Sequence, residues 1–204
     1  MLYINKLYLV RAKLKTNQMR KVIFDINLSV DGCCDHTKLS GNDEIFEYFV
    51  NLFRDTDQHV FGRKTYELMV PFWPDVAKSR SGTTEAMNEF AQAFDAVDKT
   101  VVFSRSLDRV EGKNTRIVRT SPQDEIRRLK QEEGKNISIG GLDLLSQLIE
   151  TGLIDEYHFL IHPFVVGEGR RLLDGISLQE KLQLKLVEST VFKSGIVALR
   201  YLKQ

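Results

Sequence analysis

The sequence predicts an α/β fold of three layers, in which helices cover both faces of a mixed, mostly parallel sheet of about eight strands. Three observations indicate this class. Short runs rich in β-branched residues alternate with helical stretches from residue 21 onward, which is typical of parallel sheets. The last run directly follows residues 192–195, a connection of hairpin length with Gly at its tip, so the sheet should end in an antiparallel pair. No linker or repeat divides the 204 residues, so we expect one domain.

Eight segments have the length and composition of strands. They are residues 22–28, 59–61, 100–103, 116–119, 136–139, 156–162, 182–188 and 196–202. Because helical stretches separate most of them, most neighbouring strands should run parallel.

Five segments predict helices, at residues 43–54, 64–70, 84–96, 122–133 and 142–151. The fourth has explicit ends: Ser121 supplies an N-cap, Pro122 a first helical position, Asp124 an acidic first turn and Gly134 a stop. The first should pack on the sheet, because one broad face is apolar and consists of Ile45, Phe46, Phe49, Val50, Leu52 and Phe53.

The formal net charge of +1 is the sum of the charges of two unlike parts of the chain. The first 24 residues hold six basic residues and no acidic one, which leaves 23 basic and 28 acidic residues in the remainder. We interpret residues 1–18 as a basic extension outside the fold and residues 19–204 as the folded domain. No dense basic block indicates a nucleic-acid partner, and no apolar run approaches the roughly 18 to 20 residues of a membrane span.

The two cysteines, Cys33 and Cys34, are adjacent, which is poor geometry for a disulfide between them. A reduced, cytoplasmic compartment fits this usage best. Cys33 is also a candidate nucleophile, but the sequence assigns it no base.

Three of the predicted strands end in segments suited to holding phosphate. Open α/β sheets bind ligands beyond the carboxyl ends of their strands, where helix N-termini favour anions. Each junction alone is compatible with ordinary turn chemistry, but three along one sheet edge would suit a dinucleotide with an additional phosphate. The segments are Gly62, Arg63, Lys64 and Thr65; Ser104 and Arg105; and Gly140 and Gly141.

Other familiar chemistries lack their motifs. The sequence has no P-loop, no complete dinucleotide-binding glycine fingerprint and no nucleophile elbow. His158 and His162 fall on a predicted strand, where four residues span roughly 13 Å, so we expect no metal site there. Asp31, in the segment 29–32, is either part of an Asp-Gly turn or a carboxylate that points from the strand end toward a ligand.

The motifs occur together in an order that resembles the dihydrofolate reductase-like superfamily, and most of all its branch with the riboflavin-biosynthesis reductase domain, the RibD C-terminal domain family. The resemblance covers about residues 19–204. It rests on residues 29–32, 61–66, 101–105, 137–141 and 154–156, the last of these leading into 163–172.

The resemblance implies a dihydrofolate reductase-like fold that binds NADPH across the sheet. Gly62, Arg63, Lys64 and Thr65 would hold cofactor phosphate, Ser104 and Arg105 would meet the 2′-phosphate, and Gly140 and Gly141 would admit the pyrophosphate. Asp31 would orient or protonate the group that receives hydride. The family also implies a homodimer, formed through the C-terminal strands.

The implied function is an NADPH-dependent reductase of a small polar substrate, of the 5-amino-6-(5-phosphoribosylamino)uracil type. Two alternatives stay open: a dihydrofolate or other pterin reductase, and a nucleotide-binding regulatory module without turnover. Glu47 is the residue of helix 43–54 closest in spacing to the carboxylate of classical folate reductases, and is a candidate substrate ligand. Trp73, beside Phe72, is either part of an aromatic lid over the pocket or of a packed loop.

Overall fold

A computed structural model describes residues 19–204 of the chain, and the predicted extension at residues 1–18 lies outside the described residues. The strands are β1 (Val22–Ser29), β2 (Thr56–Gly62), β3 (Lys99–Phe103), β4 (Thr115–Val118), β5 (Asn136–Gly140), β6 (Glu156–His162), β7 (Leu184–Val191) and β8 (Val197–Lys203). The helices are α2 (Asp43–Arg54), α3 (Arg63–Met69), α4 (Trp73–Ser79), α5 (Glu85–Asp95), α6 (Pro122–Gln131) and α7 (Leu142–Leu148), the last continued by the 3-10 turn η1 (Ile149–Thr151).

The strands form one eight-stranded sheet in the order β4-β3-β2-β5-β1-β6-β8-β7. The first six strands in this order are parallel, and β8 pairs antiparallel with both β6 and β7. The turn from β7 to β8 contains Gly195 at a φ of 83°, in the left-handed region that glycine adopts without strain. The predicted mixed sheet with a C-terminal hairpin is therefore confirmed.

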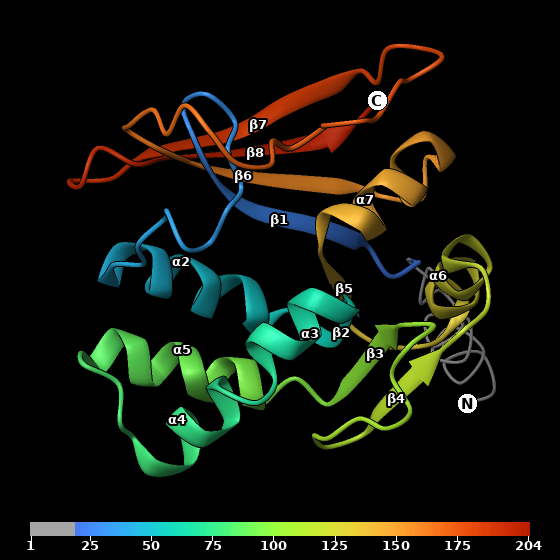
Figure 1. The fold of residues 1–204 in the computed structure, drawn as a ribbon, viewed down its shortest axis with the longest axis horizontal. Coiled ribbons are helices and arrows are strands. Elements are labelled where there is room, and N and C mark those ends of the chain that lie inside the picture. Colours follow the sequence, from blue (N-terminus) through green and yellow to red (C-terminus); the bar gives the residue numbers. More distant parts are fainter. Residues whose placement is uncertain (1–18) are drawn as a thin grey trace, which may run out of the picture.

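Helices cover both faces of the sheet and create two separate cores (Figure 1). Neighbouring residues on one strand divide between them: Val60 of β2 joins the core under α6 and α7, whereas Phe61 joins the core under α2, α3 and α5. This alternation follows from the pleat of a strand, in which successive side chains point to opposite faces. The three-layer architecture is thus confirmed.

The N-caps explain where three of the helices begin. The Asn42 side chain accepts a hydrogen bond of 3.0 Å from the backbone N–H of Ile45 at the start of α2. Thr84 caps α5 and Ser121 caps α6 in the same way. Each cap satisfies an N–H that has no partner within the helix.

Helix α4 was not predicted from the sequence, in which Trp73 is assigned to a lid or a loop. Pro74 occupies the first turn of α4, where its missing N–H costs nothing. The helix is only seven residues long, ends at Ser79 and is followed by Arg80, which has a φ of 50°. Trp73 therefore begins a short helix.

No helix of the described part of the chain is long and apolar enough to cross a membrane.

Candidate functional site

The strand order brings the three predicted junctions side by side. β3, β2 and β5 are consecutive parallel strands, so their carboxyl ends share one edge of the sheet. In the register, Gly62 at the end of β2 faces Phe103 of β3, and Phe61 faces Gly140 of β5. Segments more than 70 residues apart in the sequence, such as Gly62 and Gly140, thus form one continuous surface.

At this edge two glycines leave the backbone without side chains where the loops after β2 and β5 meet. A Cβ at Gly141, which has a φ of 117°, would lie 3.0 Å from the Thr65 hydroxyl and 3.5 Å from the backbone nitrogen of Gly62. A Cβ at Gly62 would meet nothing within 4 Å. The loops after β2 and β5 therefore approach each other, with free space beside Gly62, and a side chain at Gly141 would enter the gap.

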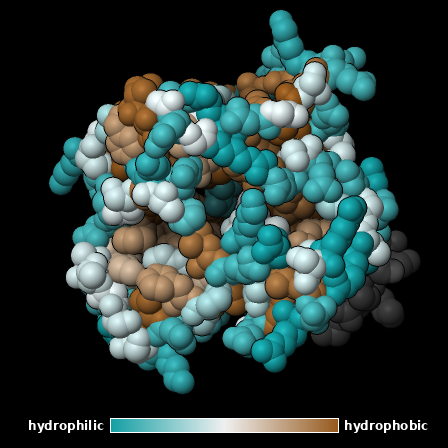
Figure 2. Space-filling model, in the orientation of Figure 1, coloured by the Kyte–Doolittle hydropathy of each residue, from teal (hydrophilic) through white to brown (hydrophobic). Residues whose placement is uncertain are grey.

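A cavity of about 420 Å³, here called the central cavity, lies between the sheet and α2. Its floor consists of polar residues on β1, β5 and β6, namely Asp25, Asn27, Ser138 and His162. Its walls are largely aromatic, with Phe46, Phe49, Phe53, Phe61, Trp73, Phe90 and Phe94. Figure 2 shows the surface hollowed near the middle of this view.

The central cavity collects several of the predicted site residues. Thr65, Gly140, Gly141 and Trp73 line it. Glu47, in contrast, is an exposed residue of α2 and is not among the lining residues.

The basic residues after β2 lie beside this cavity rather than in its lining. Arg63 is paired with Glu67 at 2.8 Å, one turn further along α3, whereas the side chain of Lys64 is exposed. Because α3 has only seven residues, we attribute little anion binding to its N-terminus and more to the open backbone and the basic side chains.

A second cavity, of about 610 Å³, lies at the end of β3, and we call it the Arg105 cavity. Arg105 is exposed there and forms no ion pair with any residue of 19–204. The Ser104 hydroxyl accepts hydrogen bonds from the N–H groups of Ser106 and Leu107, at 3.2 and 3.0 Å, which fixes the turn that carries Arg105. The arrangement can bind an anion.

Asp31 lies at the same sheet edge, but its carboxylate is engaged in holding a loop. It accepts hydrogen bonds of 3.0 Å from the backbone N–H groups of both Val166 and Gly167, and one of 2.6 Å from the Ser29 hydroxyl. These bonds, of which that from Ser29 contributes most, hold the pKa of Asp31 well below its usual range. Asp31 does not line the central cavity, and a carboxylate held ionised in this way is poorly suited to donating a proton.

Asp25 is a cavity residue that belongs to none of the sequence motifs described above. It lies in the middle of β1, and its Oδ2 accepts a hydrogen bond of 2.9 Å from the Ser138 hydroxyl of β5. Burial raises the pKa of Asp25 to about 6, although this bond and the nearby His158 act in the opposite direction. An acidic residue within an otherwise apolar strand start, Val-Ile-Phe-Asp-Ile, is the signal that identifies it.

A polar chain lies beside the floor of the central cavity, since His158 of β6 is the register partner of Asp25. The Tyr48 hydroxyl of α2 lies 2.6 Å from Nδ1 of His158, and Nε2 of His158 lies 2.8 Å from Oε1 of Glu156. Arg200 of β8 donates to the same Glu156 oxygen. Burial opposes ionisation of Glu156, but the bonds from His158 and Arg200 prevail and lower its pKa to about 2.

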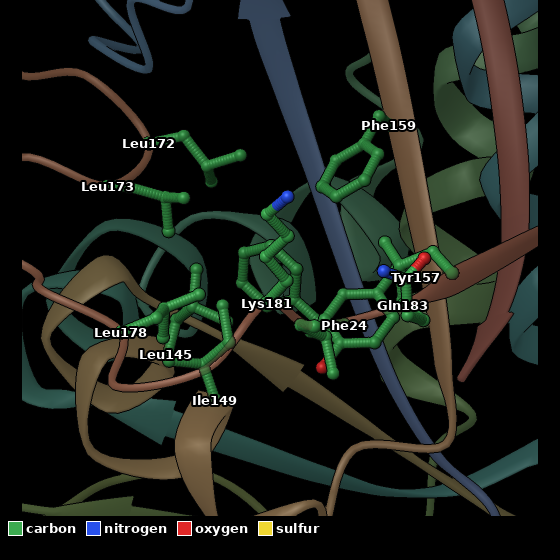
Figure 3. A pocket seen from close by; sticks show the side chains of 12 residues that line it. Phe24, Leu145, Ile149, Tyr157, Phe159, Leu172, Leu173, Leu178, Lys181 and Gln183 are labelled. Carbon is green, nitrogen blue, oxygen red and sulfur yellow. The ribbon is translucent and has the colours of Figure 1, made fainter. Parts of the chain in front are cut away.

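A third cavity, of about 390 Å³, lies on the opposite face of the sheet, because Phe24 lines it and Asp25 lines the central one (Figure 3). Most of the side chains that surround it are apolar and come from β1, α7, β6 and the segment before β7. The polar groups in its lining are Lys181, Gln183 and the Tyr157 hydroxyl. It lacks the polar floor of the central cavity, and we assign no reaction to it.

Within residues 19–204, no group of three or more His, Cys, Asp or Glu side chains is arranged to hold a metal ion. His158 and His162 have separate partners on the sheet, since His162 lies 3.2 Å from the Asn27 side chain. Cys33 is a free, fully buried thiol.

Comparison with known proteins identifies a family. The family model described as RibD C-terminal domain matches residues 20–198. Among curated proteins, the uncharacterised protein YyaP of Bacillus subtilis is 29% identical over 191 residues, which span 90% of this chain and 95% of that protein.

Solved structures of the same fold include three informative neighbours. A putative riboflavin biosynthesis protein from Shewanella sp. PV-4 has a TM-score of 0.66 at 20% identity, covering 90% of this chain and 99% of that one. A deaminase/5-amino-6-(5-phosphoribosylamino)uracil reductase from Thermotoga maritima has a TM-score of 0.63 at 14% identity, over 93% and 58% of the two chains. Dihydrofolate reductase from Enterococcus faecalis, complexed with NADP(H), has a TM-score of 0.58 at 13% identity, over 90% and 96%. The expected dihydrofolate reductase-like fold is confirmed.

Proposed function

Because this chain belongs to the RibD C-terminal domain family, we propose that it is an NADPH-dependent reductase. It transfers hydride to a C=N or C=O group of a small polar substrate. The observation that carries the proposal is the meeting of three junctions at one sheet edge, where the glycine backbones lie beside the central cavity and Arg105 lies at the end of the next strand.

The residues at this edge fit a dinucleotide with an additional phosphate. The free space beside Gly62 leaves room for a pyrophosphate close to the backbone, and the lack of a side chain at Gly141 lets the loop after β5 approach Gly62 and Thr65. Lys64 and Arg63 would stand beside it, and Arg105 would hold the 2′-phosphate from the Arg105 cavity. Bound there, NADPH supplies the hydride, while the protein supplies position and electrostatics.

The central cavity is suited to binding a substrate whose reacting group is flat and largely uncharged. Its volume of about 420 Å³ suits a small molecule, its walls are aromatic, and its lining contains no lysine or arginine. We propose a substrate of the 5-amino-6-(5-phosphoribosylamino)uracil type, the compound in the name of the Thermotoga maritima neighbour. The exposed position of Glu47 gives no support to a folate reductase with its carboxylate on α2.

We assign Asp31 a positioning role in this reaction. Its bonds to Val166 and Gly167 tie the end of β1 to the loop that follows β6. Both segments border the sheet edge at which the cofactor would bind, so the bonds fix the shape of the site.

We also propose that two copies of the chain associate through the C-terminal strands. Among residues 19–204, β7 is an edge strand of the sheet and is paired only with β8. It exposes Leu186, Val187 and Val191, and an apolar edge strand readily pairs with a second chain. Light scattering on purified protein would show a dimer, and a monomer at micromolar concentration would contradict this arrangement.

The free thiols of Cys33 and Cys34 support a reducing, cytoplasmic location.

Two measurements test the proposed reductase. Fluorescence titration should show NADPH binding that is tighter than NADH binding, and absence of binding would overturn the proposal. NADPH oxidation should then depend on added 5-amino-6-(5-phosphoribosylamino)uracil, with dihydrofolate as the comparison. Oxidation with dihydrofolate alone would indicate a pterin reductase, and tight NADPH binding without oxidation by either compound would indicate a regulatory module.

A further inference from the structure

Asp25 faces the central cavity from the middle of a central strand. β1 lies between β5 and β6, and its neighbouring residue Phe24 is fully buried in the core on the opposite face. Asp25 is only partly buried, and it lines the cavity together with Asn27 two residues further on. Its position is fixed by the strand, so the carboxyl group is presented to whatever occupies the cavity.

The contacts of Asp25 leave one carboxyl oxygen available. Oδ2 accepts the bond from Ser138, but Oδ1 receives no hydrogen bond from any residue of 19–204, and no cation among these residues forms an ion pair with Asp25. Burying a carboxylate without a counter-ion is costly, and an asparagine would accept the Ser138 bond equally well. A role confined to packing therefore gives no reason for an acid here.

The groups that face Asp25 from the neighbouring elements are already paired with each other. From α2, Tyr48 is bonded to His158 of β6, and His158 is bonded in turn to Glu156. From further along β6, His162 lies against Asn27. The remaining titratable groups in the cavity lining are Cys34 and His36, both in the loop after β1, and neither is hydrogen-bonded to Asp25.

We propose that Asp25 is the proton donor of the reductase, an inference that rests on the proposed function. The carbon of the substrate C=N group receives the hydride of NADPH, and the electron pair of the breaking π bond moves to the nitrogen. That nitrogen takes the proton from the Asp25 carboxyl group. The substrate is reduced, the nicotinamide is oxidised, and Asp25 is left as a carboxylate that regains its proton from solvent through the cavity.

The environment of Asp25 suits this task at neutral pH. Burial raises its pKa to about 6, so an appreciable share of the molecules carry the proton under ordinary conditions. A general acid is most effective when its pKa lies near the working pH. The ionised Asp31, with its pKa held low, offers no such proton.

The first test needs neither cofactor nor substrate. In protein labelled with ¹³C at aspartate carboxyl carbons, the signal that disappears in Asp25→Asn should titrate with a midpoint near pH 6. In Ser138→Ala the midpoint should move upward, because the bond that stabilises the carboxylate is lost. A midpoint in the usual aspartate range, near 4, would overturn the proposal.

The second test is catalytic and has a matched control. At saturating 5-amino-6-(5-phosphoribosylamino)uracil and neutral pH, Asp25→Asn should lower kcat by about 100-fold or more, while the Kd for NADPH stays within about twofold. The deficit should shrink as the pH falls, because substrate protonated in solution replaces the donor. Asp95→Asn, the same change at an exposed residue of α5, should leave kcat unchanged.

The outcomes separate the two proposals. If the unmodified protein oxidises NADPH and Asp25→Asn retains more than half of kcat, Asp25 is not the donor and the reductase stands. If the unmodified protein oxidises NADPH with neither compound, the reductase fails and the donor fails with it. Should Asp25→Asn not fold, Ser138→Ala decides: its kcat profile must shift to higher pH, and an unshifted profile would refute the assignment.

Discussion

The hydroxyl oxygen of Tyr48 lies 2.6 Å from Nδ1 of His158, which joins α2 directly to β6. Since Nε2 of the same ring faces Glu156 at 2.8 Å, an imidazole with its proton on Nε2 donates to Glu156 and accepts from Tyr48. Burial raises the pKa of Tyr48, so the phenol keeps its proton for this bond. α2 carries much of the aromatic wall of the central cavity, and this bond therefore sets the position of that wall against its floor.

Tyr48→Phe should destabilise the fold by about 1 to 3 kcal/mol, because Nδ1 of the buried His158 loses its partner. Urea denaturation measures the change. Tyr201→Phe is the matched control, since the Tyr201 hydroxyl has no hydrogen bond to any residue of 19–204, and we expect it to cost less than about 0.5 kcal/mol. Equal losses in both variants would mean that ring packing, and not the bond to His158, supports α2.

His59→Leu should remove a loss of stability at acid pH. His59 is 2% exposed and is stacked against Phe61 and Phe94, and burial lowers its pKa to about 3. The unfolded chain binds a proton at this residue below about pH 6.5 and the folded chain does not, so stability falls as the pH falls below that point, by up to about 1.4 kcal/mol per pH unit.

Denaturation at a series of pH values between 7 and 4 measures this slope in the unmodified protein, in His59→Leu and in His36→Leu, a control at an exposed position. The slope should become smaller in the first variant and persist in the second. An unchanged slope in His59→Leu would assign the acid sensitivity to other groups.

Arg105→Ala should weaken NADPH binding by about 10- to 100-fold and NADH binding much less, because only NADPH carries the 2′-phosphate that Arg105 would meet. Fluorescence titration with both cofactors gives the two ratios. Arg109→Ala removes an exposed arginine outside the Arg105 cavity and should affect neither. If Arg105→Ala weakens both cofactors equally, the 2′-phosphate lies elsewhere.

Gly141→Ala should weaken NADPH binding by about 10-fold or more, because its Cβ would enter the gap beside Gly62 and Thr65. The φ of 117° also strains any other residue, so stability should fall by about 1 kcal/mol or more. Gly175→Ala is a suitable control, because Gly175 has a φ of 74° and open space around it. It shares the backbone strain, and unimpaired NADPH binding in this variant would isolate the steric effect at Gly141.

Asp31→Asn should loosen the loop after β6, because an amide group can no longer accept from Val166 and Gly167 with both of its ends. Hydrogen exchange should show faster exchange of these two amides, with kcat lowered and NADPH affinity nearly intact. Asp35→Asn should leave these amides protected, because within residues 19–204 the Asp35 carboxylate bonds only to Thr37 in its own turn. Unaltered exchange in Asp31→Asn would remove the positioning role of Asp31.

Local signals were sufficient for much of the fold. The apolar face of α2 and its cap at Asn42 are both local, and the helix was predicted with its observed limits, Asp43–Arg54. β6 was likewise predicted over its observed span, Glu156–His162. Helix α4 escaped prediction because Pro71 and Pro74 read as loop residues, whereas Pro74 is compatible with the first turn of a helix.

The sequence indicated those candidate site residues that lie at the ends of strands, and did not indicate the one whose position depends on which face of a strand is covered. Gly62 and Gly141 lie next to each other because β2 and β5 are adjacent, as expected for junctions on one parallel sheet. The backbone partners of Asp31, Val166 and Gly167, lie 135 and 136 residues further along the chain, which no local pattern indicates. Asp25 was missed because a polar residue on a strand usually marks a solvent face, and here that face borders the central cavity.

Because β8 runs antiparallel to β6, the start of the first strand and the end of the last strand lie close together. The backbone N–H of Asp155 donates to the carbonyl of Val22 at 2.9 Å, and the N–H of Lys203 donates to the carbonyl of Asp155 at 3.1 Å. Val22 and Asp155 lie at the amino ends of β1 and β6, and Lys203 lies beside them at the carboxyl end of β8, at the sheet edge opposite Gly62 and Gly141. A surface tether, a fused reporter or a linker for circular permutation attached near residues 20 and 203 would thus leave the opposite edge open to small molecules.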